Sequence, residues 1–263
     1  MSEPEMVLLD RRGPIATIVL NRPQRRNAFS VAMWQAFTTL VRDLDADESV
    51  RVIVVRGAGD QAFASGADIH EFDTQRSNPE QGARYIKIVG AALDAVARAT
   101  KPVLAMIAGY CVGGGCELAC ACDLRIAADN ARFSIPAARL SVHIGLDEVR
   151  HLVGLVGMGR AKDLLLTGRS VDAREAERIG LVEYVVSLSE LETFTYELAE
   201  RLAENAPLTL ASTKLAVGLC TPGPEAERWR EYVDVFIRTF GSADYREGTR
   251  AFLEKRPPRF EGR

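Results

Sequence analysis

The sequence predicts one α/β domain that continues into a helical C-terminal region. Short apolar runs alternate with longer amphipathic segments up to about residue 190, and beyond that point every candidate segment has helical spacing. No linker rich in proline or serine interrupts the 263 residues, a length that one large domain can occupy. We therefore divide the chain into a core, residues 1–190, and a helical region, residues 191–263.

The individual elements follow from local signals in the sequence. Strands are expected at the apolar runs 15–20, 52–56, 103–108 and 124–127. Ser30 can cap a helix over residues 31–46, in which apolar side chains recur at helical spacing. A helix over about residues 81–99 ends before Pro102, because proline disfavours helical backbone in the preceding residue. Further helices are expected at 190–204, 207–218, 225–240 and 243–254.

The composition of the chain indicates which kinds of binding partner to expect. With 47% hydrophobic residues, 26% charged residues and a formal net charge of -3, the chain lacks the basic character of nucleic-acid-binding proteins. No apolar run reaches the roughly 20 residues of a membrane helix, and the acidic N-terminus does not resemble a signal peptide. We therefore expect neither nucleic acid nor membrane as a partner, and a cytoplasmic location.

Cysteine and histidine are used sparingly. The chain has five cysteines, four of them within residues 111–122, and their spacing matches neither a disulfide framework nor a zinc site. With only three histidines in the chain, we expect these cysteines to be small buried side chains rather than ligands. No metal site is predicted.

Residues 109–123 are the most informative segment of the chain. Gly113, Gly114 and Gly115 open a helix, so backbone N–H groups and the positive end of the helix dipole can face a ligand without a Cβ in the way. An enolate oxygen suits such a site. Glu117 follows in the first turn among small apolar residues, where a carboxyl group can act as a general acid or base. The alternative is that the glycines allow close helix packing and the acid complements the dipole.

A second glycine-containing loop, within residues 62–71, follows the strand at 52–56 and enters a helix. It offers another backbone N–H donor. Both loops belong to a set of segments that resembles the crotonase superfamily, also called the enoyl-CoA hydratase/isomerase family. The four matching segments occur in the family's order and span nearly the whole chain, at 21–29, 64–68, 101–123 and 166–182.

The resemblance implies the crotonase (ClpP-like) fold, a repeated ββα superhelix whose C-terminal helices make trimer contacts, with trimers pairing into hexamers. It also implies that the N–H groups of Ala67 and Gly114 form an oxyanion hole for the carbonyl of an acyl-CoA thioester. Glu117 matches the first of the two catalytic glutamates of the hydratases. The acyl-CoA is then the substrate, and no further cofactor is implied.

The resemblance further implies which residues bind coenzyme A. Arg25 and Arg26 correspond to positions that hold the CoA phosphates, and Ser65 to one whose backbone carbonyl meets the adenine. The basic tail that contains Lys255 corresponds to a further phosphate contact, with a solvated basic terminus as the alternative. The full expected set is Arg25, Arg26, Ala28, Ser65, Gly66, Ala67, Asp68, Ile69, Gly113, Gly114 and Lys255.

The sequence departs from the family pattern at the second catalytic glutamate, because Ala137 stands at its position. His143, Asp147 and Glu148 are nearby ionisable groups that could replace it. We favour Asp147 and Glu148 as acids in the first turn of the next helix, and a core or loop position for His143. The sequence thus predicts an enoyl-CoA hydratase that uses Glu117. Isomerisation, decarboxylation, thioester hydrolysis or a non-catalytic CoA-binding scaffold remain as alternatives.

Overall fold

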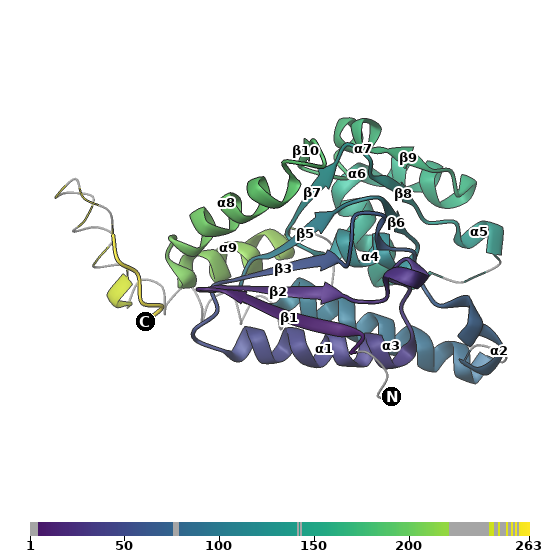
Figure 1. Ribbon diagram of the computed structural model, residues 1–263, viewed down its shortest axis with the longest axis horizontal. Coiled ribbons are helices and arrows are strands. Elements are labelled where there is room, and N and C mark those ends of the chain that lie inside the picture. The colour runs from purple at the N-terminus through teal and green to yellow at the C-terminus, as the bar shows by residue number, and fades with distance from the viewer. Residues whose placement is uncertain are drawn as a thin grey trace.

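The computed structural model describes residues 5–75, 79–140, 142, 144–220, 242–244, 247, 251, 254, 256 and 258–263 (Figure 1). The helix expected at 225–240 lies outside these residues, and so does most of the helix expected at 243–254. Two candidate site residues, His143 and Lys255, also lie outside the described part of the chain.

Six strands form the larger of two sheets. β1 and β2 pair antiparallel, and the other neighbours run parallel. In the order of the sheet, the strands are β1 (Val7–Arg12), β2 (Ile15–Leu20), β3 (Val52–Gly57), β5 (Val103–Ile107), β7 (Leu124–Ala128) and β10 (Tyr184–Val186). β2, β3 and β5 are buried along nearly their whole length. Strands covered on both faces have apolar runs rather than alternating patterns, which is why the sequence identified these strands.

Helices cover both faces of the larger sheet (Figure 1). α1 (Val31–Ala46) and α3 (Pro79–Arg98) pack on one face, and α8 (Leu191–Ala203) packs on the other. Consecutive residues of β3 show the division, since Val55 belongs to the core with α1 and α3 whereas Val54 packs with α8. α8 therefore shares a core with the sheet, and the boundary at residue 190 stays a prediction from the sequence.

The smaller sheet carries the loops of the candidate site. Its strands, in order, are β4 (Ala62–Ala64), β6 (Tyr110–Val112), β8 (Arg132–Ser134) and β9 (Val171–Asp172), and the last pair is antiparallel. α4 (Gly114–Ala121) begins directly after β6 and packs against α3 and α6 (Leu146–Thr167). Further elements are η1 (Pro23–Arg25), η2 (Ile69–Glu71), α2 (Phe72–Gln75), α5 (Ala137–Leu140), α7 (Ala173–Ile179) and α9 (Pro207–Leu219).

The structure confirms the α/β class and the strands and helices expected within the described residues. Ser30 caps α1, because its hydroxyl accepts a hydrogen bond from the N–H of Met33 at 3.2 Å. The smaller sheet was not predicted, since strands of two or three residues are too short to show an alternating pattern. None of the helices within the described ranges has the length and apolar character needed to cross a membrane.

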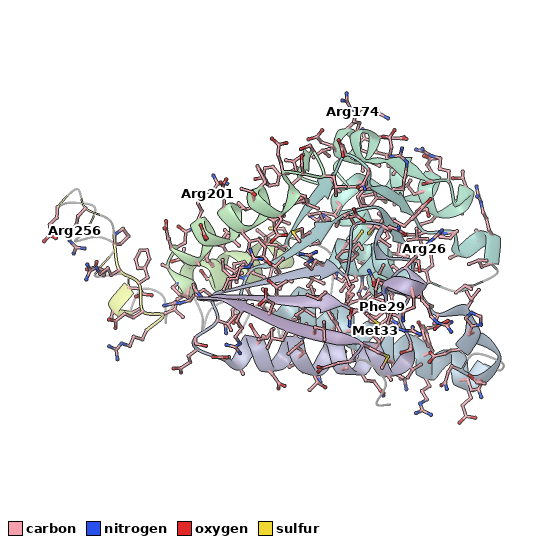
Figure 2. The ribbon with its side chains drawn as sticks, in the orientation of Figure 1. Arg26, Phe29, Met33, Arg174, Arg201 and Arg256 are labelled. Atoms are coloured by element: carbon pink, nitrogen blue, oxygen red, sulfur yellow. The ribbon has the colours of Figure 1, made fainter. Side chains whose placement is uncertain are left out.

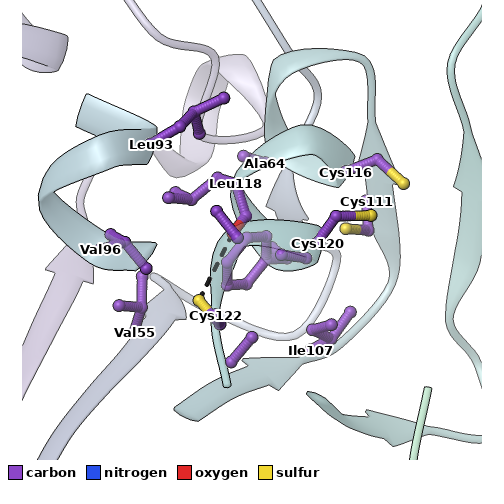
Figure 3. Packing of buried hydrophobic residues seen from close by; sticks show 14 of the residues in the cluster. Val55, Ala64, Leu93, Val96, Ile107, Cys111, Cys116, Leu118, Cys120 and Cys122 are labelled. Carbon is purple, nitrogen blue, oxygen red and sulfur yellow. Dashed lines mark hydrogen bonds between the residues drawn. The ribbon is translucent and has the colours of Figure 1, made fainter. Parts of the chain in front are cut away.

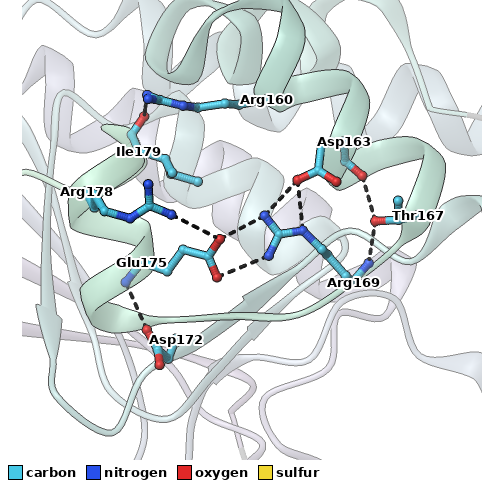
Figure 4. A network of polar contacts seen from close by, with 8 residues as sticks. All are labelled: Arg160, Asp163, Thr167, Arg169, Asp172, Glu175, Arg178 and Ile179. Carbon is cyan, nitrogen blue, oxygen red and sulfur yellow. Dashed lines mark hydrogen bonds and ion pairs between the residues drawn. The ribbon is translucent and has the colours of Figure 1, made fainter.

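A network of ion pairs joins α6 to α7 (Figure 4). Arg169 donates to Asp163 of α6 at 2.8 Å and to both carboxylate oxygens of Glu175 of α7, at 2.8 and 3.1 Å. Asp172 caps α7 by accepting from the N–H of Glu175 at 2.9 Å. The network holds the second half of α6, which follows a break in the helical backbone at Gly157.

Candidate active site

The first loop of the site, residues 65–68, follows β4. Gly66 has a φ of +94°, a conformation that residues with a Cβ rarely adopt. Phe29 bonds to the loop on both sides of Ala67, because its N–H donates to the carbonyl of Gly66 and its carbonyl accepts from the N–H of Asp68, each at 2.8 Å. The peptide groups of an extended segment alternate in direction, so the N–H of Ala67 points away from Phe29.

The second loop joins β6 to α4. Gly113 has a φ of +52°, and its N–H donates to the carbonyl of Ser134 at 2.8 Å, which fixes the turn. Gly114 is the first residue of α4, so its N–H has no acceptor within the helix. The positive end of the helix dipole adds to the attraction of an anion at this position.

The two loops pack directly on each other. A Cβ placed on Gly66 would lie 3.0 Å from the carbonyl oxygen of Val112 and 3.4 Å from the nitrogen of Gly114. A Cβ on Gly115 would overlap the backbone of Ala64 and lie 2.8 Å from its Cβ. The bare Cα atoms therefore allow the close approach that brings both N–H donors to one cavity.

The two loops line a cavity of about 400 Å³. Trp34 and Tyr85 form part of its wall, and the indole N–H of Trp34 donates to the hydroxyl of Tyr85 at 3.1 Å. Trp34 also packs against Gly114, where a Cβ would lie 3.1 Å from the indole ring. Many of the other lining side chains are aliphatic, among them Ile69, Ile86, Val89, Ile135, Leu140 and Ile144. The cavity suits an apolar group whose polar end meets the N–H donors.

Glu117 lies in the first turn of α4 and lines the same cavity. Its Oε2 lies 3.9 Å from the position that a Cβ on Gly114 would occupy. The neighbouring side chains of Cys116 and Leu118 are buried in the core. The carboxyl group is therefore beside the second N–H donor, in a position to exchange a proton with the carbon next to a carbonyl held there.

The thiols around α4 pack in the core (Figure 3). Cys111, Cys116, Cys120 and Cys122 are all buried. A hydrogen bond with Cys111 is the main cause that raises the pKa of the Cys116 thiol, and burial raises the pKa of Cys122 to about 12. Protonated thiols are poor nucleophiles and poor metal ligands, so Cys116 and Cys122 act as packing residues. The described residues contain no group of three or more potential ligands placed to hold a metal ion.

Arg125 anchors the C-terminal end of α4. Its guanidinium donates to the carbonyl oxygens of Ala119 at 3.2 Å and Cys122 at 2.7 Å, and it pairs with Glu183. The Arg125 side chain is buried, so its charge is compensated both by the carboxylate and by the negative end of the helix dipole. These contacts fix the helix that carries the second N–H donor and Glu117.

The described residues of the segment 136–148 form another part of the cavity wall. Ala137 is buried and lines the cavity, so the position of the missing glutamate offers no group for proton transfer. Glu148 also lines the cavity and is only 6% exposed. The side chain of Asp147, in contrast, is 61% exposed and pairs with Arg150 at 2.7 Å. Asp147 is a surface residue at the start of α6, and the acid/base role considered for it from the sequence does not fit this position.

Glu148 lies in the first turn of α6, as the interpretation favoured from the sequence has it, but it is buried in the cavity wall. One signal in the sequence could have identified it, because Glu148, Leu152 and Val156 stand four residues apart and share the buried face of the helix. Of the described residues that line the cavity, Glu117 and Glu148 are the two with a carboxyl group. The sequence identified the first of these, and it offered the second as a possible replacement acid while favouring a first-turn role for it.

Asp68 ties the first loop to the N-terminal segment. Its carboxylate pairs with Arg22 at 2.8 Å and Arg25 at 3.6 Å, and accepts from the N–H of His70 at 3.1 Å. Burial favours the protonated form, but these hydrogen bonds and positive charges outweigh it, so the pKa of Asp68 lies below its ordinary value. Arg22 also donates to the carbonyl of Ala28 at 2.6 Å. The pair thereby holds the loop that carries the first N–H donor.

The structure brings several predicted CoA-binding residues together beside the first loop. Arg26, labelled in Figure 2, lies over the ring of Tyr110 at 4.9 Å, and its carbonyl accepts from the N–H of Ser65 at 3.0 Å. The Ser65 hydroxyl donates to the carbonyl of Arg25 at 3.4 Å. The side chains of Arg25 and Arg26 are exposed, whereas Ala28 is buried.

Two backbone donors at glycine-rich loops, beside an acidic residue in an apolar cavity, define a class of enzyme that stabilises an anion formed from a carbonyl group. The model of the enoyl-CoA hydratase/isomerase family matches residues 10–263 of the chain. The chain belongs to this family, which is the crotonase superfamily, and the resemblance noted from its motifs is confirmed.

Relatives and solved structures resemble the chain over nearly its whole length. It is 34% identical to the short-chain-enoyl-CoA hydratase of Clostridium acetobutylicum, over 95% of each protein. It is 36% identical to the crotonyl-CoA hydratase of Syntrophomonas wolfei, over 97% of this chain and 98% of that protein. The crystal structure of an enoyl-CoA hydratase/carnithine racemase from Magnetospirillum magneticum matches with a TM-score of 0.92 at 40% identity, covering 98% of this chain and 96% of that one. The crotonase-type fold is thereby confirmed.

Proposed function

We propose that the protein is an enoyl-CoA hydratase, which adds water across the double bond of a 2-enoyl-CoA thioester. The observation that carries this proposal is the placement of two backbone N–H donors and Glu117 around one apolar cavity. The relatives support it, since those from C. acetobutylicum and S. wolfei are named as hydratases of short-chain enoyl-CoA and of crotonyl-CoA. Crotonyl-CoA is therefore the first substrate to test.

The N–H groups of Ala67 and Gly114 bind the carbonyl oxygen of the thioester. When water adds at C3, negative charge moves to this oxygen and an enolate forms. Because the donors belong to the backbone of packed loops, they are already aimed at the oxygen before the charge develops. Glu117, beside the second donor, transfers the proton at C2, the carbon next to the carbonyl.

Isomerisation of a 3-enoyl-CoA is a second candidate, and Ala137 is the observation that favours it. Moving a proton from C2 to C4 needs one acid/base group and no attacking water, and Glu117 can supply that group. Conversion of a 3-enoyl-CoA, with no hydration of a 2-enoyl-CoA, would identify this activity. Decarboxylation and simple CoA binding have no specific observation among the described residues in their favour.

The oligomeric state and the cellular location that we propose are inferred from the family of the protein. We propose a trimer, or a hexamer made of two trimers, that works in the cytoplasm with the CoA thioester as substrate and without a further cofactor. Light scattering on the purified protein tests the assembly, since the chain has a mass of 28.8 kDa. A mass equal to that of a single chain would contradict it.

The hydratase proposal is tested by following the loss of the conjugated absorbance of crotonyl-CoA with the wild-type protein and with Glu117→Gln. Glutamine keeps the size of the side chain but cannot transfer a proton. We expect hydration by the wild type and a rate ~10²–10⁴-fold lower in the variant. A wild type that hydrates no 2-enoyl-CoA, or equal rates in the two proteins, would contradict the proposal.

A further inference from the structure

Glu148 is a second carboxylic acid in the wall of the cavity. It stands in the first turn of α6 and is almost completely buried. It lines the same cavity as Glu117 and Ala137. The wall that lacks a carboxyl group at position 137 therefore carries one further along the same segment.

Gly145 leaves the space in which the carboxylate of Glu148 lies. A Cβ placed on Gly145 would overlap Oε2 of Glu148 and lie 2.8 Å from its Cδ and 3.0 Å from its Oε1. The φ of Gly145 is −69°, so the backbone conformation does not require glycine here. The carboxylate folds back over the bare Cα and occupies the space that a Cβ would take. A methyl group at position 145 would therefore displace the carboxylate from this place.

Stabilisation of the helix does not account for this arrangement. An acidic residue complements the dipole of a helix from an exposed position, as Asp147 does beside Arg150 in the same turn. Burying the adjacent carboxylate adds a cost in desolvation that a helix cap does not need. Buried acids in apolar clefts are, in contrast, typical of groups that transfer protons.

We propose that Glu148 is the second acid/base of hydration, in place of the glutamate that Ala137 lacks. This inference rests on the proposed hydratase function. Glu117, beside the N–H of Gly114, transfers the proton at C2. Glu148, on the segment that follows Ala137, takes the proton from the water that attacks C3.

The two carboxyl groups balance the reaction. The carboxylate of Glu148 removes a proton from water, and the water oxygen bonds to C3. The electrons of the double bond move through the enolate and form a bond between C2 and the proton that the neutral carboxylic acid of Glu117 gives up. One water has then been added, Glu148 holds a proton and Glu117 is ionised. Proton exchange with solvent restores the starting state.

Two measurements separate the roles of the two acids. The first is hydration of crotonyl-CoA, which needs both. The second is exchange of the C2 hydrogen of butyryl-CoA with D₂O, which needs the oxyanion donors and Glu117 but no attack at C3. For Glu148→Gln we expect hydration to fall ~10²–10⁴-fold, while exchange stays within about threefold of the wild-type rate. Glu117→Gln is expected to lose both activities.

Hydration by Glu148→Gln within about threefold of the wild-type rate would overturn the proposal. Equal losses of hydration and exchange in this variant would also overturn it, because Glu148 would then not be specific to the water. Gly145→Ala is a second variant that keeps the acid and displaces its carboxylate with a methyl group. It is expected to show the same split, hydration lost and exchange retained.

Asp147→Asn is the matched control, because it removes a charge from the same helical turn at a position outside the cavity. We expect it to keep both activities, and a loss of hydration like that of Glu148→Gln would assign the effect to the charge of the helix terminus instead. The two proposals fail in different ways. If Glu117→Gln loses hydration and Glu148→Gln keeps it, the hydratase function stands and the role of Glu148 is wrong. If the wild type neither hydrates nor exchanges, both proposals fall.

Discussion

The two loops that contain Ala67 and Gly114 line the same cavity as the described residues of the segment 136–148. The two parts present different kinds of chemical group. The loops present backbone N–H groups, positioned by Gly66 and Gly113 at positive φ and by direct packing of one loop on the other. The segment 136–148 presents side chains, with an alanine at position 137 and a buried carboxylate at Glu148.

This difference shows which part of the site can change in sequence and keep the same kind of chemical group. A backbone donor does not depend on its own side chain, so it persists as long as the loops keep their close packing. An acid, in contrast, can be replaced by another acid that reaches the same space from a different position. In this protein the loops retain the family pattern, whereas the acid/base segment departs from it at Ala137.

Removing one backbone donor is the largest effect that we expect from a change in the two loops. Ala67→Pro deletes the N–H that points away from Phe29 into the site, and proline has no hydrogen to replace it. The rate of crotonyl-CoA hydration should fall by on the order of 10²–10³, the usual cost of one oxyanion donor. Steady-state kinetics on the purified variant measures it.

Ala67→Gly is the control, because it changes the side chain and keeps the N–H. We expect it to retain most of the hydration rate. If proline and glycine at this position reduced the rate equally, the side chain and not the backbone donor would be what matters at this loop.

The next prediction concerns the ion pair between Arg22 and Asp68, which supports the first loop. Arg22→Met removes the closest partner of the buried Asp68 carboxylate. The free energy of unfolding should fall by about 3 kcal/mol, because a buried charge is left with weaker compensation. Urea denaturation followed by circular dichroism measures this change. An unchanged midpoint would show that the pair does not hold the loop.

The same pair predicts a dependence on pH. The pKa of Asp68 is lower in the folded protein than its ordinary value of 3.8. Its contribution to stability is therefore fully present above that value and is lost as the pH falls below it towards the folded-state pKa. Below about pH 4 the wild type should lose stability more steeply than Arg22→Met, in which the pKa shift is reduced. Parallel slopes for the two proteins would contradict this.

The smallest effect that we expect comes from moving the carboxyl group of the wall from position 148 to position 137. Ala137→Glu introduced into Glu148→Gln restores a carboxyl group at the position of the family pattern. We expect recovery of hydration by about tenfold over Glu148→Gln alone, since the new acid enters the same cavity without an optimised environment. No recovery in a folded double variant that still binds butyryl-CoA would show that the two positions are not equivalent.

The sequence was sufficient where local chemistry decides the structure. Ser30 and the helical spacing after it predicted α1, and the glycines before Glu117 predicted a loop that presents N–H groups. It was not sufficient for β4, β6, β8 and β9, because three residues or fewer show no period and their pairing depends on distant segments. For a similar reason the sequence could not distinguish the surroundings of Asp147 from those of Glu148. Both suit the first turn of a helix, and only the tertiary packing of α6 places one in solvent and the other in the cavity.

A crystal structure with butyryl-CoA bound would test most directly which groups of the cavity wall contact the thioester oxygen, C2 and C3. We predict the thioester oxygen at about 3 Å from the nitrogens of both Ala67 and Gly114, the distance of an N–H···O hydrogen bond. C2 should then face Glu117, and C3 should face Glu148. A thioester oxygen bound away from the two donors, or a Glu148 carboxylate turned away from C3, would contradict this assignment.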